Sequence, residues 1–133
     1  MSSKAILDAI WTKLSASALY TTLGGRIALN SLPADTRLPL LVYGPTGDPS
    51  ISKAFGGVDR YDLELEFTFW QTGSDGTTAY TLSDSLVTAL SGTISPTGFD
   101  RLTVVRTAVG VPSFSDDCWS ISDRYRAIGF RTA

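Results

Sequence analysis

The sequence predicts an α+β fold, in which a mainly antiparallel or mixed β-sheet of about four to five strands carries two helices on one face. Three observations predict it. The segment 61–70 alternates between apolar and mostly polar residues, as a long half-buried strand does. Two other segments, at 6–23 and 79–90, place apolar residues at helical spacing. Further β-rich runs flank the second helix, so both helices are expected to pack on one sheet.

Length and composition indicate one globular domain over residues 1–133. A chain of 133 residues can bury its own core, and its single cysteine cannot form an intrachain disulfide. The net charge of −2 argues against a general nucleic-acid binder, although a local basic patch is still possible. The sequence begins without an apolar signal region and holds no run near the ~18 apolar residues of a membrane-spanning helix. We therefore expect synthesis in the cytosol.

The first predicted helix begins after a capping serine at position 2 or 3 and is followed by a further turn over 19–23. Gly24 and Gly25 are expected to end it, because glycine accepts the left-handed conformation of a helix C-terminus. A short extended run follows over 26–30, and a short buried strand over 40–43 begins after Pro39. The apolar face of the helix consists of Ile6, Ile10, Trp11, Leu14 and Ala18.

The segment 44–57 is rich in Gly, Pro, Ser and Asp, and it also contains Lys53 and Phe55. It predicts an exposed loop of about a dozen residues, a length that suggests a binding or assembly role. The long strand over 61–70 follows, and a slip of one residue would expose its aromatic side chains. Its apolar face consists of Tyr61, Leu63, Leu65, Phe67 and Phe69, and its polar face of Asp62, Glu64, Glu66, Thr68 and Trp70.

The second half predicts a turn over 73–76, a helix that ends near Gly92, and a loop over 93–98. A strand over 102–109, a loop over 111–117 and a long final strand over 119–130 complete the chain. The final strand places Arg124 and Arg126 on one face. The predicted helix face consists of Ala79, Leu82, Leu86, Val87 and Leu90, and the apolar face of the last strand of Ile121, Tyr125 and Ala127.

The residue types argue against an enzyme and against a bound cofactor or metal. The chain contains no His, which removes the commonest general base, the Ser-His and Cys-His nucleophile pairs, and the Cys/His zinc sites. The glycine pairs at 24–25 and 56–57 match neither a phosphate-binding loop nor a dinucleotide fingerprint. Gly25-Arg26 could suggest phosphate binding, but a helix end explains these glycines better.

The charged residues of the long strand leave three interpretations open. Asp62, Glu64 and Glu66 lie about 7 Å apart along a strand, too far for adjacent ones to share one cation easily. If the last strand pairs beside this one, Glu64 and Glu66 meet Arg124 and Arg126 across the ladder. Otherwise these charges face solvent or a neighbouring subunit.

Two aromatic positions are candidate contact sites. Trp70 lies on the acidic face and is either covered by the following loop or an anchor for a partner. Asp116 and Asp117, near Trp119, are either turn residues or contacts at the rim of an interface. Cys118 is expected to act as a small apolar residue at the start of a strand.

The run from 6 to 71 resembles the tail-completion, or tail-terminator, family of long-tailed bacteriophages and gene transfer agents. The resemblance depends on Leu23-Gly24-Gly25-Arg26-Ile27 after a helix, on Pro33, and on Leu38-Pro39-Leu40-Leu41-Val42-Tyr43. An alternating strand that ends in Phe69-Trp70-Gln71 and a helix over 80–90 follow. The resemblance covers about two thirds of the chain, and the remaining third matches only in its strand character.

This resemblance implies an α+β structural protein of the virion without catalytic residues. Such proteins form a ring, expected to be a hexamer, at the head-proximal end of the tail. The implied partners are copies of itself, the tail tube protein and a head-closure or neck protein; the implied location is the tail–neck junction, after assembly in the bacterial cytoplasm. DNA would pass through an acidic or neutral lumen without specific binding, since phosphate binding needs cations.

Two other function classes remain. Another neck component, such as a head-closure protein or adaptor, would share most of these features. A small ligand-binding or hydrolytic domain would use the acidic face. The residues that would carry an assembly interface are Asp62, Glu64, Glu66, Trp70, Arg124, Arg126, Asp116, Asp117, Lys53 and Phe55.

Overall fold

A computed structural model describes residues 3–53, 58–73, 75–92, 94 and 99–132. Its elements are, in chain order, α1 (Ser3–Ser15), α2 (Ala18–Thr22), β1 (Ile27–Leu29), β2 (Leu40–Pro45), β3 (Ser50–Lys53), β4 (Val58–Gln71), α3 (Thr77–Ala89), β5 (Arg101–Ala108), β6 (Ser113–Ser115) and β7 (Cys118–Thr132). The predicted α+β class is confirmed.

The described strands form one mixed sheet whose central path runs β1-β2-β4-β7-β5. β1 is parallel to β2, and every other pair is antiparallel. β4 and β7 pair along their whole length, from Val58 opposite Thr132 to Gln71 opposite Trp119. A pair of this length spans roughly 45 Å at ~3.3 Å per residue. These two strands form the centre of the sheet, and the other strands pair with one or the other of them or with β2.

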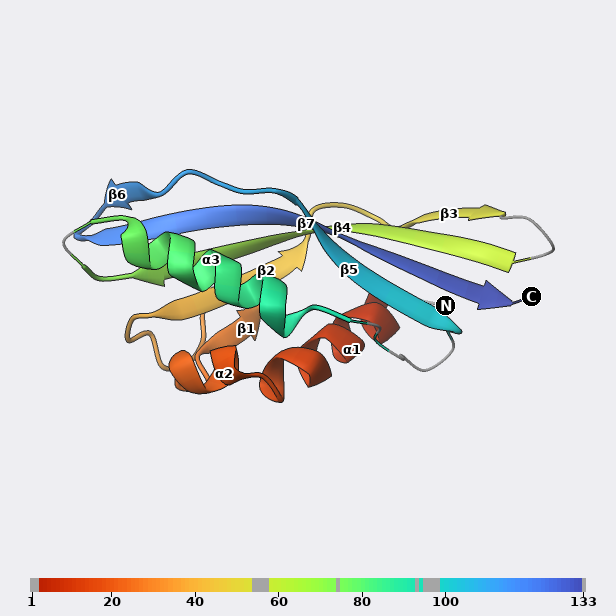
Figure 1. The fold of residues 1–133 in the computed structure, drawn as a ribbon, viewed down its shortest axis with the longest axis horizontal. Helices are drawn as coiled ribbons and strands as arrows, with labels where there is room; N and C mark the ends of the chain where they lie inside the picture. Colours follow the sequence, from red (N-terminus) through yellow and green to blue (C-terminus); the bar gives the residue numbers. More distant parts are fainter. Residues whose placement is uncertain (1–2, 54–57, 74, 93, 95–98, 133) are drawn as a thin grey trace.

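The helices and the short strands divide this long pair into two parts. α1, α2 and α3 lie together on one side of the sheet, whereas β3 and the adjoining ends of β4, β7 and β5 extend beyond them (Figure 1). β2 pairs with residues 65–70 of β4, and β3 pairs with residues 59–62 on the same strand. β5 and β6 likewise pair with successive parts of β7.

The core lies between the helices and the face of β4 that the alternation predicts to be apolar. Leu63, Leu65, Phe67 and Phe69 are fully buried there, and they pack in one cluster with Ile6, Ile10 and Leu14 of α1 and with Leu82 and Leu86 of α3. The Phe67 ring stacks on Tyr43 at 5.2 Å and meets Tyr125 edge-on at 4.9 Å. Each such side chain contributes about 1.5–3 kcal/mol on burial. The predicted apolar face of β4 is the buried one, which confirms its predicted register.

The N-terminal helical region follows the prediction with one interruption. Ser17 separates α1 from α2, because its hydroxyl oxygen accepts the Tyr20 N–H at 3.4 Å and caps a new helix. Gly24 and Gly25 have φ of 60° and 76°, which confirms the helix end expected there. Trp11 and Val87, by contrast, are 39% and 38% exposed, and Ala18 is exposed as well, so assigning these three to the buried helix faces was wrong.

Two segments predicted as loops contain strands. β2 continues through Pro45, and β3 lies within the expected loop over 44–57, of which 54–57 fall outside the described residues. The expected loop over 111–117 contains β6, in which Phe114 pairs with Trp119 of β7. The loop predictions failed because β4 and β7 are long enough to offer free backbone groups to short polar segments, which have little strand propensity of their own.

Candidate assembly surface

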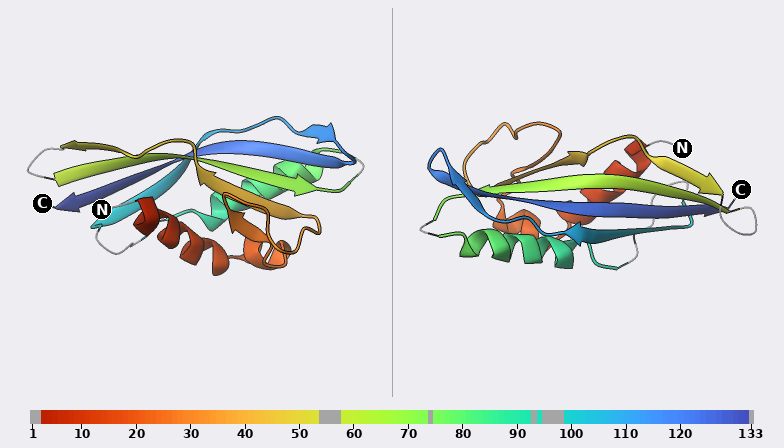
Figure 2. Two further views of the ribbon diagram at one scale, coloured as in Figure 1. Left: turned by 180° about the vertical axis from the view of Figure 1, so that it is seen from behind. Right: turned by 90° about the horizontal axis from the view of Figure 1, so that it is seen from above.

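The face of the sheet opposite the core is formed by the alternate residues of β4 and β7; we name it the open face. Seen from above, β4 and β7 lie in front of α1 on this side (Figure 2, right). The in-register pairing of β4 with β7 brings Glu64 opposite Arg126 and Glu66 opposite Arg124. The open face therefore carries the acids and the arginines that the sequence singled out.

The charges of the open face pair with one another. The Arg126 guanidinium lies 3.1 Å from an Asp62 oxygen and donates a hydrogen bond of 3.2 Å to Glu64. Arg124 lies 3.9 Å from Glu66, and Arg60 donates to Asp62 at 3.4 Å. The predicted cross-strand pairing is confirmed, and the open face is an alternation of both signs rather than an acidic surface.

Of these pairs, the one around Asp62 is the most shielded. The Asp62 side chain is 23% exposed, against 59% for Glu64, and two arginines face it. Pairs as exposed as Glu64–Arg126 contribute only ~0–1 kcal/mol each, so they fix which strands pair more than they stabilise the fold. Arg60 was not among the predicted residues, although its two-residue spacing from Asp62 places it on the same face.

Trp70 lies at the far end of the open face, opposite Leu40 on β2 and Ser120 on β7. It is half-buried, and its neighbour Leu40 is 2% exposed, so this corner is better shielded than the charged part. A hollow of about 220 Å³ lies nearby and has Glu66 and Thr68 in its wall. Glu66 is the one ionisable group among the residues that line it besides Tyr43.

The β6–β7 hairpin, residues 113–118, holds the next group of predicted residues. Asp116 and Asp117 have φ of 53° and 63°, which is the turn that a two-residue hairpin with the right-handed strand twist requires. The expectation that they are turn residues is confirmed. Across the hairpin the Phe114 and Trp119 rings lie 5.2 Å apart, and Phe114 is 55% exposed. The hairpin thus presents an aromatic ring and two carboxylates at one end of the sheet.

The remaining predicted residues are not brought into this surface. Lys53 ends β3, where its backbone pairs with Asp59, and Phe55 lies outside the described residues. Cys118 begins β7 and is half-buried, with its sulfur 3.4 Å from the Ser115 carbonyl oxygen. The interface role of the residues predicted for it, Lys53 and Phe55 included, remains a prediction.

Sequence reasoning missed a buried polar cluster beneath α3. Asp123 of β7 is fully buried, and its carboxylate accepts hydrogen bonds from the Ser83 hydroxyl and from the Gly110 N–H at 2.9 Å. Arg106 donates to Ser83 at 3.2 Å and lies 3.4 Å from Asp84. Burial and the nearby Asp123 raise the pKa of Tyr125 far above its usual range. The cluster ties α3, β7 and the chain after β5 together.

No nucleophile-and-base arrangement follows from this cluster. Ser83 is hydrogen-bonded to a carboxylate, but both groups are fully buried, so a substrate would have no access to them. The alternation of the last strand was the signal for Asp123, because its odd position places it among the buried Ile121, Tyr125 and Ala127.

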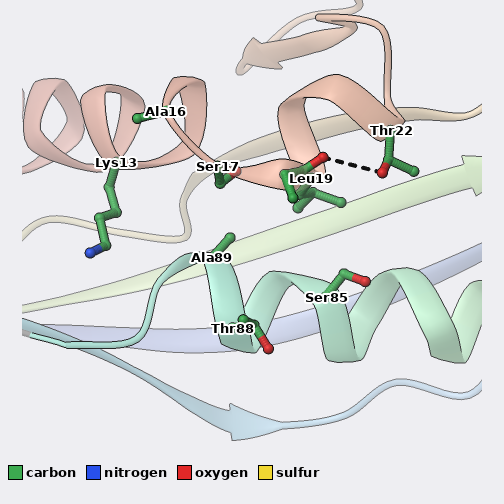
Figure 3. A pocket seen from close by; sticks show the side chains of 9 residues that line it. Lys13, Ala16, Ser17, Leu19, Thr22, Ser85, Thr88 and Ala89 are labelled. Atoms are coloured by element: carbon green, nitrogen blue, oxygen red, sulfur yellow. Dashed lines mark hydrogen bonds between the residues drawn. The ribbon is translucent and has the colours of Figure 1, made fainter.

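A groove of about 430 Å³ separates the α1–α2 junction from α3 (Figure 3). Most of its described lining residues are small, and Lys13 is the one charged residue among them: Lys13, Ala16, Ser17, Ala18, Leu19, Thr22, Ser85, Thr88 and Ala89. The groove could not be predicted from the sequence, because it forms only where the break at Ser17 lies beside the end of α3.

The part of the chain that the structure describes contains no helix long and apolar enough to cross a membrane. Nor do three acidic or cysteine side chains converge anywhere in the described ranges as they would around a metal ion. What the described surface offers is instead a charge-balanced sheet face, an aromatic hairpin and a groove lined by small residues.

Comparison with known proteins gives a likeness in fold. No family model matches the sequence, and no curated protein matches it. A chain of the solved "Virion of native gene transfer agent (GTA) particle" superposes with a TM-score of 0.76 at 18% identity, covering 98% of this chain and 98% of that chain. A second solved chain, whose name states no function, has a TM-score of 0.66 at 14% identity and covers 100% of this chain and 98% of that one. At these identities the likeness shows a shared fold.

Proposed function

We propose that this chain is a structural virion protein that forms a ring at the head-proximal end of a phage-type tail, ends the polymerisation of the tail tube and joins the tail to the neck. The observation that carries the proposal is the superposition on a chain of the gene transfer agent virion along 98% of both chains. The short motifs by which the sequence resembles the tail-terminator family support the same class of particle.

The surface supports an assembly role over a catalytic one. The open face neutralises its own acids with Arg60, Arg124 and Arg126, so it offers no unpaired carboxylate row to a cation or substrate. A ring of single-domain subunits, in the proposal a hexamer, needs two different contact patches on each subunit. The hairpin and the groove described above are two such patches. DNA could pass a charge-balanced face without being held, because holding phosphates requires net positive charge.

Capping of the tail tube tests this function. The purified chain is mixed with the tail tube protein of its own particle while that protein polymerises, and tube lengths are measured by electron microscopy. The proposal predicts short tubes with added density at one end and a complex of both proteins in light scattering. Tube protein alone is the control. Unchanged tube lengths, together with a chain that stays monomeric and binds neither tube nor neck proteins, would overturn the proposal.

A second candidate is another neck component of the same particle, such as a head-closure protein or adaptor. The fold match to a virion chain supports it equally, because a shared fold does not fix the position in the particle. The same mixing experiment, repeated with the head-side connector protein added, separates the two candidates. A ring that binds the head-side connector and leaves tube lengths unchanged identifies the neck component.

A further inference from the structure

The groove between the α1–α2 junction and α3 is open to a side chain from another molecule. Figure 3 shows Ala16, Ser17 and Leu19 on one wall and Ser85, Thr88 and Ala89 on the other, with Lys13 at one end. Its volume of about 430 Å³ exceeds that of one aromatic side chain. Because most of the lining side chains are short, a bulky group can enter without displacing them.

Lys13 gives the groove its charge. Among the described side chains, the other lysines and arginines near acids form ion pairs, such as Lys4 with Asp8 at 2.6 Å and Arg37 with Asp35 at 2.7 Å. No such pair involves Lys13 within the described ranges. The groove therefore has a cation at its rim that an incoming carboxylate would neutralise.

The β6–β7 hairpin has the complementary properties. Phe114 is 55% exposed and Val111, just before β6, is 80% exposed. Asp116 and Asp117 are exposed at the turn, and neither takes part in an ion pair with the described residues. The two-residue turn and the Phe114–Trp119 contact hold the hairpin in a defined shape. A preformed shape lowers the entropy lost on docking.

We infer that the β6–β7 hairpin of one copy docks in the groove between the α1–α2 junction and α3 of the next copy. Phe114 would lie against the small residues, and Asp116 and Asp117 would face Lys13. The inference rests on the proposed ring and names its subunit contact. Figure 1 and the view from behind place β6 above the central strands and α2 below them, so a copy does not fill its own groove. Hairpin and groove are different patches of one chain, which makes the contact heterologous. Repetition of such a contact closes a ring when the rotation between neighbouring copies divides a full turn.

Disulfide cross-linking tests this contact with the native cysteine. Cys118 lies at the hairpin, and Thr88→Cys adds a second thiol in the groove wall. Under oxidation the variant should give a ladder of covalent oligomers that ends at the size of the ring. An internal disulfide is not expected, because Trp119 lies near Gly76 at the other end of α3, roughly 18 Å from position 88 at 1.5 Å per residue. The matched control is Ser52→Cys on β3, which should remain uncross-linked.

A charge series tests the pairing with Lys13 separately. Lys13→Glu should weaken self-association about tenfold or more by light scattering, since it sets three acids against one another. Adding Asp116→Asn and Asp117→Asn to that variant should recover most of the loss, and asparagine tolerates the positive φ of both positions. Phe114→Ser should weaken association at least as strongly.

The results separate this inference from the proposed function. If the wild type forms rings but Thr88→Cys gives no ladder and Phe114→Ser assembles normally, the hairpin–groove contact is wrong and the ring remains. If the control Ser52→Cys cross-links as well as Thr88→Cys, the contact is also wrong. If the wild type never associates and never caps a tube, the proposed function fails, and the contact with it.

Discussion

Asp123 is the residue on which the arrangement beneath α3 depends most. Its buried carboxylate accepts hydrogen bonds from the buried Ser83 hydroxyl and from the half-buried Gly110 N–H, and replacing it by alanine removes the acceptor of both. We expect Asp123→Ala to lower the free energy of unfolding by about 2–4 kcal/mol in chemical denaturation. The matched control is Ser85→Ala, whose hydroxyl bonds only to Thr81 within the same helix and which should cost less than ~0.5 kcal/mol. Equal small losses in both variants would show that the cluster does not stabilise the fold.

A second residue-scale prediction concerns pH. The Arg37 side chain and backbone N–H both donate to Asp35 and lower the pKa of its carboxyl from 3.8 to about 2. Because the folded pKa is depressed, this contribution to stability is present above about pH 4 and is lost as the pH falls from 3.8 towards 2. A carbon NMR titration should give a midpoint near 2 for Asp35.

The Arg37→Gln variant provides the control for that titration. Its Asp35 midpoint should rise towards 3.8, because the strongest donor is gone. The pKa of Asp75 is lowered by the Thr77 N–H rather than by a cation and should stay low in the variant. An Asp35 midpoint that is the same in both proteins would contradict the Arg37 assignment.

For single residues, the sequence predicted which face of the sheet a side chain lies on better than it predicted what surrounds that side chain. The alternation placed Glu64, Glu66, Arg124 and Arg126 on one face, and the pairs it suggested are present. It did not reveal that Asp123 is buried against Gly110, because that contact joins β7 to a segment whose path only the folded chain defines. The one sign of Asp123 in the sequence was its odd-numbered position on the last strand, which places it on the buried face.

At the scale of elements, the β4–β7 pair organises the molecule, and its register is open to a direct test. A double-mutant cycle of Glu64→Gln and Arg126→Gln should give a coupling free energy of about 0.2–1 kcal/mol at low salt, decreasing as salt screens the charges. The exposed Lys4–Asp8 pair within α1 is the control, with an expected coupling of about 0.3–0.5 kcal/mol. A coupling of zero at low salt, alongside a measurable coupling in the Lys4–Asp8 control, would contradict the Glu64–Arg126 ion pair that this register predicts.

The long elements were predictable because each has its own periodicity. β4, β7, α1 and α3 follow the patterns of the sequence within a few residues at each end. β3 and β6 were missed because their polar residues form strands only by pairing with β4 and β7. The break between α1 and α2 escaped notice for a similar reason, since Ser17 acts through its hydrogen bonds to Leu14 and Tyr20 rather than through a change in apolar spacing.

On the scale of the whole molecule, shape is informative where sequence is not. Identity to the virion chain is 18%, yet 98% of both chains superpose. The residues that keep this shape are the buried alternation and the helix faces, and many apolar residues can occupy such positions. The surface residues are free to differ, so the shared fold does not determine the proposed contact between this chain's hairpin and groove.

Assembly of this chain into a closed ring would be visible in an image of the purified protein. Negative-stain electron microscopy at increasing protein concentration should show rings with a central opening and one rotational symmetry, which we expect to be sixfold. Light scattering of the same sample should give the mass of that number of 14.2 kDa chains. Particles that remain single copies at every concentration, or open filaments that never close, would contradict this assembly.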